Sequence, residues 1–138
     1  MSEAFGDSLP KALCCELADA AAPGGAAKAL LLVSVDGAGH PRVCVLSIGE
    51  VQVIDPKRLA AYVKRGSATH ENLLAARPVV LWCVLAGAAY SVKAKPALAQ
   101  KTAADDERDR FELNISEVLR DFHPGAVLIG GPTYRSSA

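Results

Sequence analysis

The chain has 138 residues, of which 51% are hydrophobic and 22% are charged, and its formal net charge at pH 7 is zero. This length predicts a single domain over residues 1–138, because a chain of about 150 residues buries roughly 68–70% of its unfolded surface around one core. The balanced charge lacks the basic footprint of a protein that binds nucleic acid or an anionic membrane, so we expect neither partner.

Targeting signals and cysteine spacing favour the cytoplasm. No apolar stretch reaches about 18 residues, which predicts no transmembrane helix. The first residues are acidic and lack the basic region and apolar block of a signal peptide. Four cysteines stand at positions 14, 15, 44 and 83, with no zinc-ligand spacing. In a chain without an export signal we expect these thiols to be reduced and buried.

The first half of the chain predicts one helix and four strands. Asp7 or Ser8 caps a helix over about residues 7–22, with leucines at positions 9, 13 and 17 on one face. Two apolar runs around the turn sequence DGAGHP predict a hairpin. The segment RLAAYV has helical propensity as well, but its short length between two turns favours a strand. The predicted strands are 29–35, 42–48, 50–54 and 58–63.

The second half predicts two helices and four further apolar segments. A short helix extends from about Thr69 to Ala76, and a polar surface helix covers residues 102–111. In residues 111–122 the apolar alternation changes phase near Val118. The predicted strands are 78–85, 89–95 and 125–131. We therefore expect a small β-barrel of about six or seven antiparallel strands with short helices, or alternatively a two-layer α+β sandwich.

The stretch GSATHENLLAAR, residues 66–77, concentrates polar side chains at a predicted helix start. Unpaired backbone N–H groups at a helix N-terminus attract anions, and hydroxyls at Ser67 and Thr69 with the amide of Asn72 add hydrogen-bonding groups. The alternative is that Thr69 only caps the helix. On this stretch alone, capping is the favoured explanation.

No local pattern marks a catalytic nucleophile or a metal site. The serines do not stand in a Gly-x-Ser-x-Gly turn, and the acidic residues have no spacing typical of a catalytic pair. His40, His70 and His123 stand on separate elements, so we expect exposed loop histidines and no metal.

Three segments in order resemble the pyridoxamine 5′-phosphate oxidase-like family of flavin-binding split β-barrels. They are LLLVSVDGAGHPRVCVLSIGEV, SATHENLLAARPVVLW and YSVKAKPAL, and the resemblance extends over about residues 29–97. It implies a mainly β fold, a split barrel of about six antiparallel strands with short flanking helices. It also implies a homodimer with FMN at the interface between the subunits.

Carried over residue by residue, the resemblance implies five cofactor contacts. Arg42 lies on the second strand of the hairpin, and Ser67, Thr69 and Asn72 lie on the loop and helix beside the phosphate and ribityl chain. Lys93 would place positive charge beside the flavin ring or a substrate anion; the alternative is an ordinary exposed lysine on a strand. A phosphate favours a guanidinium fork, hydroxyl donors and backbone N–H groups, which agrees with these residue types.

The resemblance implies a flavin-dependent oxidoreductase that acts on a small molecule, without assigning catalytic residues. Ser47, Thr69 and His70 stand where the oxidases carry basic residues, so we do not expect pyridoxamine 5′-phosphate oxidation itself. The alternative is a non-catalytic module on the same barrel that holds a flavin, a deazaflavin or haem, with His70 as the haem ligand, or no cofactor at all. A structural partner of another protein is a third possibility.

Overall fold

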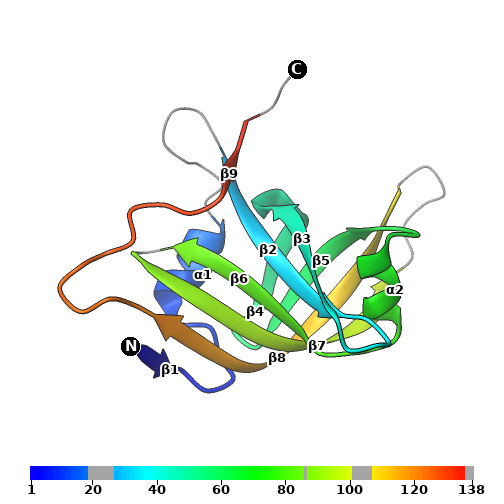
Figure 1. Ribbon diagram of the computed structural model, residues 1–138, viewed down its shortest axis with the longest axis horizontal. Coiled ribbons are helices and arrows are strands. Elements are labelled where there is room, and N and C mark those ends of the chain that lie inside the picture. Colours follow the sequence, from blue (N-terminus) through cyan, green and yellow to red (C-terminus); the bar gives the residue numbers. More distant parts are fainter. Residues whose placement is uncertain (19–26, 86, 101–106, 136–138) are drawn as a thin grey trace.

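The computed structural model describes residues 1–18, 27–85, 87–100 and 107–135. In these residues the chain is mainly β, with two α-helices, one 3₁₀ helix and an antiparallel sheet of nine strands (Figure 1). The helices are α1 (Lys11–Ala18), η2 (Ile48–Glu50) and α2 (Ala68–Leu74). The strands are β1 (Ser2–Ala4), β2 (Ala27–Val35), β3 (Pro41–Ser47), β4 (Val51–Asp55), β5 (Arg58–Lys64), β6 (Val79–Leu85), β7 (Ala88–Gln100), β8 (Arg108–Asp121) and β9 (Thr133–Tyr134).

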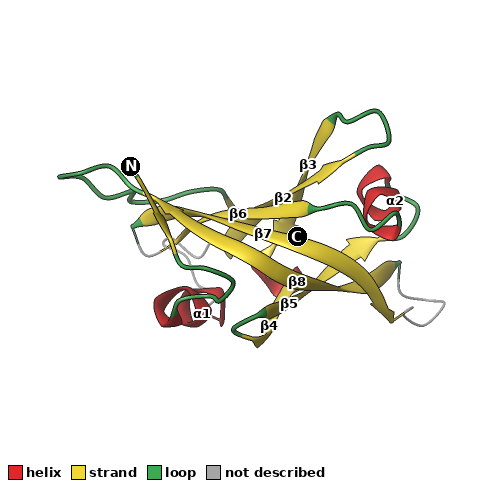
Figure 2. Ribbon diagram, turned by 90° about the horizontal axis from the view of Figure 1, so that it is seen from below, coloured by secondary structure: helices red, strands yellow, loops and turns green. Residues whose placement is uncertain are grey.

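The sheet is open and follows the order β3-β2-β6-β7-β8-β5-β4, with β1 added beside β8 and β9 beside β2. Figure 2 shows that the β3–β2 end and the β5–β4 end diverge, with α2 between them. This confirms the mainly β class and is consistent with a split barrel. The predicted strand number is too low, because β1 and β9 have three and two residues and are too short to leave a periodic pattern.

Alternating apolar residues of the central strands form the core. In β6 the burial alternates strictly, so Val79, Leu81 and Cys83 point inward while the residues between them are half-buried on the outward face. Leu9, Leu13 and Leu17 are also buried, as their spacing of four predicts, and close one end of the core. The helix that carries two of them begins at Lys11, later than predicted, and residues 19–26 lie outside the described part. Neither described α-helix is long and apolar enough to cross a bilayer.

Two predicted elements differ from the structure. Residues 108–111 belong to β8 rather than to a polar helix, because that strand pairs with β5 and β7 at once and the ladders override local propensity. Residues 101–106 of the same prediction lie outside the described part. Residues 125–131 do not form a strand: Leu128 N–H donates to the carbonyl of Gly87 at 2.9 Å, and Ile129 is 99% exposed.

The cysteines are less uniformly buried than expected. All four are free thiols, and Cys83 is fully buried on the inward face of β6. Cys14 and Cys44 are half-buried, whereas Cys15 is exposed. The expectation is wrong for Cys15, because α1 turns Leu13 and Leu17 toward the core and Cys15, between them, away from it.

Burial of Cys83 predicts an inert thiol. Desolvation raises its pKa to about 12, and the thiolate is the form that reacts with alkylating agents. Iodoacetamide at mildly alkaline pH should therefore label Cys15 in the folded protein and leave Cys83 unmodified until urea unfolds the chain. Peptide mass spectrometry measures both sites. Equal labelling rates of Cys83 and Cys15 in the folded protein would contradict the burial of Cys83.

Candidate functional site

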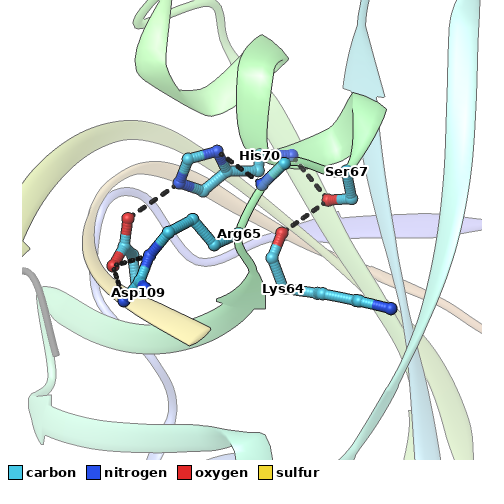
Figure 3. A network of polar contacts seen from close by, with 6 residues as sticks. Lys64, Arg65, Ser67, His70 and Asp109 are labelled. Carbon is cyan, nitrogen blue, oxygen red and sulfur yellow. Dashed lines mark hydrogen bonds and ion pairs between the residues drawn. The ribbon is translucent and has the colours of Figure 1, made fainter. Parts of the chain in front are cut away.

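Helix α2 begins at Ser67, whose side chain caps it (Figure 3). The Ser67 hydroxyl accepts a hydrogen bond from the N–H of His70 at 3.1 Å and donates to the carbonyl of Lys64 at 2.8 Å. The cap is thus Ser67 and not Thr69, because Ser67 has the extended backbone that a capping residue adopts. Thr69 lies inside the first turn and is only 2% exposed.

A buried polar cluster fixes α2 to the sheet. The Nε2 atom of His70 lies 2.9 Å from Oδ2 of Asp109 on β8, and Arg65 bonds Oδ1 of the same carboxylate through two nitrogens at 3.0 and 3.1 Å (Figure 3). The Nδ1 atom of His70 accepts the N–H of Gly66 at 3.4 Å, so the ring proton stands on Nε2 and is donated to Asp109. The expectation of an exposed loop is therefore wrong for His70, whereas His40 and His123 are exposed.

The Asp109 carboxylate is stabilised in its charged form. Hydrogen bonds from His70 and Arg65 lower the pKa of Asp109 and outweigh desolvation, which acts in the opposite direction. Because His70 and Asp109 stand 39 positions apart, no local pattern in the sequence predicts their contact. Among the described residues, no group of three His, Cys, Asp or Glu side chains is placed to hold a metal ion.

Two of the predicted cofactor contacts flank one buried serine. The Asn72 amide donates to the hydroxyl of Ser34 on β2 at 3.0 Å, and both residues are buried. Ser34 in turn lies opposite Arg42 in the β2–β3 ladder, and Arg42 is exposed. Asn72 and Arg42 are thus both neighbours of Ser34. No local pattern points to Ser34, because its role depends on the strand register.

Lys93 lies apart from these residues, beside a pocket on the outward face of the sheet. It stands on β7 opposite Val80, and its Nζ atom lies 2.9 Å from Oε1 of Glu117 on β8. The pocket has a volume of about 260 Å³. Its walls are formed by Val33, Val35, Pro78, Val79, Val80, Lys93, Ala94 and Ser116. Concave apolar walls with a few polar groups are typical of small-molecule sites.

The Asp109 cluster predicts a loss of stability in acid. Since the folded protein holds Asp109 at a lowered pKa, its stabilising contribution is complete above the unfolded value of about 3.9 and is lost as the pH falls through the lower folded pKa. Asp109→Asn should lower the free energy of unfolding at pH 7 by about 1–3 kcal/mol and flatten the acid dependence. Urea unfolding across the acid range measures both effects.

The exposed Asp121 on the same strand provides the matched control for that prediction. Asp121→Asn should leave the stability at pH 7 nearly unchanged. Equal stability of the Asp109→Asn protein and this control would contradict the role assigned to the cluster.

The fold, and not the sequence, relates the chain to known proteins. No protein-family model matches it, and no curated protein matches its sequence. A protein from Lactobacillus delbrueckii assigned as a pyridoxamine 5′-phosphate oxidase has a similar structure, with a TM-score of 0.67 and 20% identity, covering 86% of this chain and 98% of that protein.

Two solved oxidoreductases are also similar. The NADH:FAD oxidoreductase SgcE6 of Streptomyces globisporus has a TM-score of 0.53 at 10% identity, covering 80% of this chain and 85% of its own. The styrene monooxygenase flavin reductase of Pseudomonas putida S12 has a TM-score of 0.53 at 14% identity, covering 78% and 92%. At these identities the likeness concerns the fold: the chain shares the fold of pyridoxamine 5′-phosphate oxidase-like proteins and flavin reductases, which is consistent with the split barrel that the sequence resemblance implies.

Proposed function

We propose that this protein binds a flavin, with FMN as the first candidate, and is an oxidoreductase that transfers electrons between the flavin and a small molecule. The pocket beside Lys93 carries the proposal. A flavin ring is flat and largely apolar, and it needs apolar walls with few, well-placed polar groups. Val33, Val80 and Ala94 supply such walls, and Lys93 supplies the charge. The names of two structural relatives, a flavin reductase and an NADH:FAD oxidoreductase, support the same class of chemistry.

A homodimer with the cofactor at its interface is part of this proposal. Two rows of apolar side chains cross strands β3, β2 and β6 in register on the outward face. They are Val43, Val33 and Val80 in one row, and Val45, Leu31 and Trp82 in the other. Val43 and Val45 are 57% and 65% exposed. Contiguous exposed apolar surface of this kind marks an interaction site.

The size of the pocket supports an interface site as well. Its volume of about 260 Å³ lies below the roughly 300–1,000 Å³ of sites that enclose a drug-sized ligand. A second copy packed against the outward face would add the missing wall and cover the apolar rows. The pocket of one subunit then forms half of a shared site.

We assign the phosphate and ribityl end of the cofactor to Arg42, Ser67, Thr69 and Asn72. Arg42 is exposed, and its guanidinium has the fork geometry that suits a phosphate. Ser67 and Asn72 have hydrogen-bonding partners within the chain, so their role in this assignment is to fix the position of α2 and of Ser34 next to Arg42. Thr69 is buried in the first turn of the same helix.

The protein needs no nucleophile for this function. A bound flavin supplies the redox chemistry itself, and the protein supplies binding, orientation and charge. The apolar walls exclude water from one face of the ring. The Lys93 ammonium would stabilise negative charge that develops on a carbonyl oxygen of the ring. A cytoplasmic location belongs to the same proposal and is supported by four free thiols, which are typical of a reducing compartment.

The absorbance spectrum of the freshly purified protein, before and after addition of FMN and removal of the excess, tests the proposal. We expect a retained flavin spectrum that NADH or NADPH bleaches and an acceptor such as dioxygen restores. Retained flavin that no donor reduces would support a binding module without turnover. A protein that stays colourless and gains no thermal stability from FMN would contradict flavin binding.

A matched pair of lysines on β7 tests the position of the flavin. Lys93→Ala should weaken flavin binding about tenfold or more, since a hydrogen bond to a charged group contributes about 1.5–3 kcal/mol. Lys95 is exposed two residues further along the same strand and does not line the pocket, so Lys95→Ala should leave the affinity unchanged. Fluorescence titration measures both. Equal effects of the two substitutions would remove Lys93 from the site.

A further inference from the structure

Strand β8 contains a bulge that changes which of its side chains face the core. Phe111, Leu113 and Ile115 are buried, as alternation requires, but the next buried residue is Val118. Across the ladder, Lys93 pairs with Glu117 and Ala94 pairs with Ile115, so Ser116 has no opposite residue on β7. One extra residue in β8 therefore explains the change of phase that the sequence shows near Val118.

The bulge brings Ser116 and Glu117 of β8 beside Lys93. Ser116 and Lys93 line the outward pocket, and Glu117 lies next to that wall through its contact with Lys93. Ser116 lines the pocket beside Lys93, and its hydroxyl donates to the carbonyl of Lys93 at 3.1 Å. Glu117 follows directly and bonds the Lys93 ammonium at 2.9 Å. Bulges commonly redirect side chains beside binding sites, and this one places a hydroxyl and a carboxylate next to an ammonium.

The donors and acceptors of Lys93, Ser116 and Glu117 that have no partner in the described part of the chain determine which ligand groups this end of the pocket can bind. The Ser116 hydroxyl donates its proton to the carbonyl of Lys93, so its oxygen can only accept a hydrogen bond from a ligand. Glu117 has a second carboxylate oxygen, also an acceptor, and the Lys93 ammonium has further N–H donors. The end of the pocket therefore presents acceptors and a donor side by side. An anion would meet the Glu117 carboxylate, and an apolar group would leave all three polar side chains without a ligand partner.

We propose that this end of the pocket recognises a planar amide or imide, an N–H group adjacent to a carbonyl oxygen, with Ser116 and Glu117 as its specificity-determining residues. The N–H donates to Ser116 or Glu117, and the carbonyl accepts from Lys93. This inference rests on the proposed function. Two ligands of that function carry the required chemistry: the pyrimidine edge of a flavin ring and the carboxamide of a nicotinamide donor.

The test compares ligands that differ only in that N–H group. Lumiflavin and 3-methyllumiflavin share the ring, but methylation removes the imide proton. We expect the wild-type protein to bind lumiflavin about tenfold or more tightly than its methylated form, a difference of about 1.4 kcal/mol. Glu117→Gln and Ser116→Ala should each reduce this preference several-fold. Ser116→Thr, which keeps the hydroxyl, should retain it, and Ser2→Ala on the neighbouring strand β1 serves as the control.

A second arm distinguishes the two sources of the amide. Nicotinamide and N,N-dimethylnicotinamide, which has no amide N–H, are compared in the same way. A preference that depends on Ser116 in this arm assigns the polar end to the electron donor instead of the flavin. Thermal melting of each variant establishes that it is folded before titration.

The outcomes separate this inference from the proposed function. Flavin binding with equal affinity for methylated and unmethylated rings, and no preference in the nicotinamide arm, overturns the inference alone. A preference that persists unchanged in Ser116→Ala and Glu117→Gln reflects the bulk of the methyl group and also overturns it. Failure of both ring systems to bind overturns the inference and the proposed function together.

Discussion

Strand β8 holds the two halves of the molecule together. Residues 110–121 of this strand, except Ser116, pair with β7 along one edge, while the first half of the other edge pairs with β5 and the last part with β1. The β3-β2-β6-β7 half and the β5-β4 half thus meet at this strand. Phe111 and Leu113, both fully buried, fill the space between them. Without both ladders the two inward faces would not share a core, and the apolar residues of each would face water.

The same strand links the fold to the candidate site. At its start, Asp109 holds α2 through His70, and past its middle Ser116 and Glu117 stand beside Lys93. A buried carboxylate is stable only where hydrogen bonds compensate for its lost hydration. Asp109 receives such hydrogen bonds from Arg65 and from His70. Strand β8 therefore positions both the helix assigned to the phosphate end and the polar end of the pocket. A change in β8 affects stability and binding together.

Local features of this fold are predictable from sequence, and long-range ones are not. The spacing of leucines in the first helix, the turn around Asp36 and the polar start of α2 each depend on residues a few positions apart; the Asp36 carboxylate, for example, accepts the N–H of His40 at 2.9 Å. The polar composition of residues 102–111 predicts a helix, but residues 108–111 form a strand because strand pairing overrides local composition. Arg42 and Lys93 follow from a family resemblance, whereas Asp109 and Ser116 depend on register, which no local pattern encodes.

The bulge in β8 also affects how this sequence tolerates insertions and deletions. Side chains of a strand alternate between its faces, and a bulge absorbs one added residue so that the positions after it keep their faces. Ser116 is the residue without a partner on β7, so its removal would restore regular alternation and leave Val118 facing the core opposite Val92. Related chains that lack this residue would keep the same buried positions on both sides of the gap. A single-residue gap at this position would therefore spare the core and remove only the hydroxyl that lines the pocket.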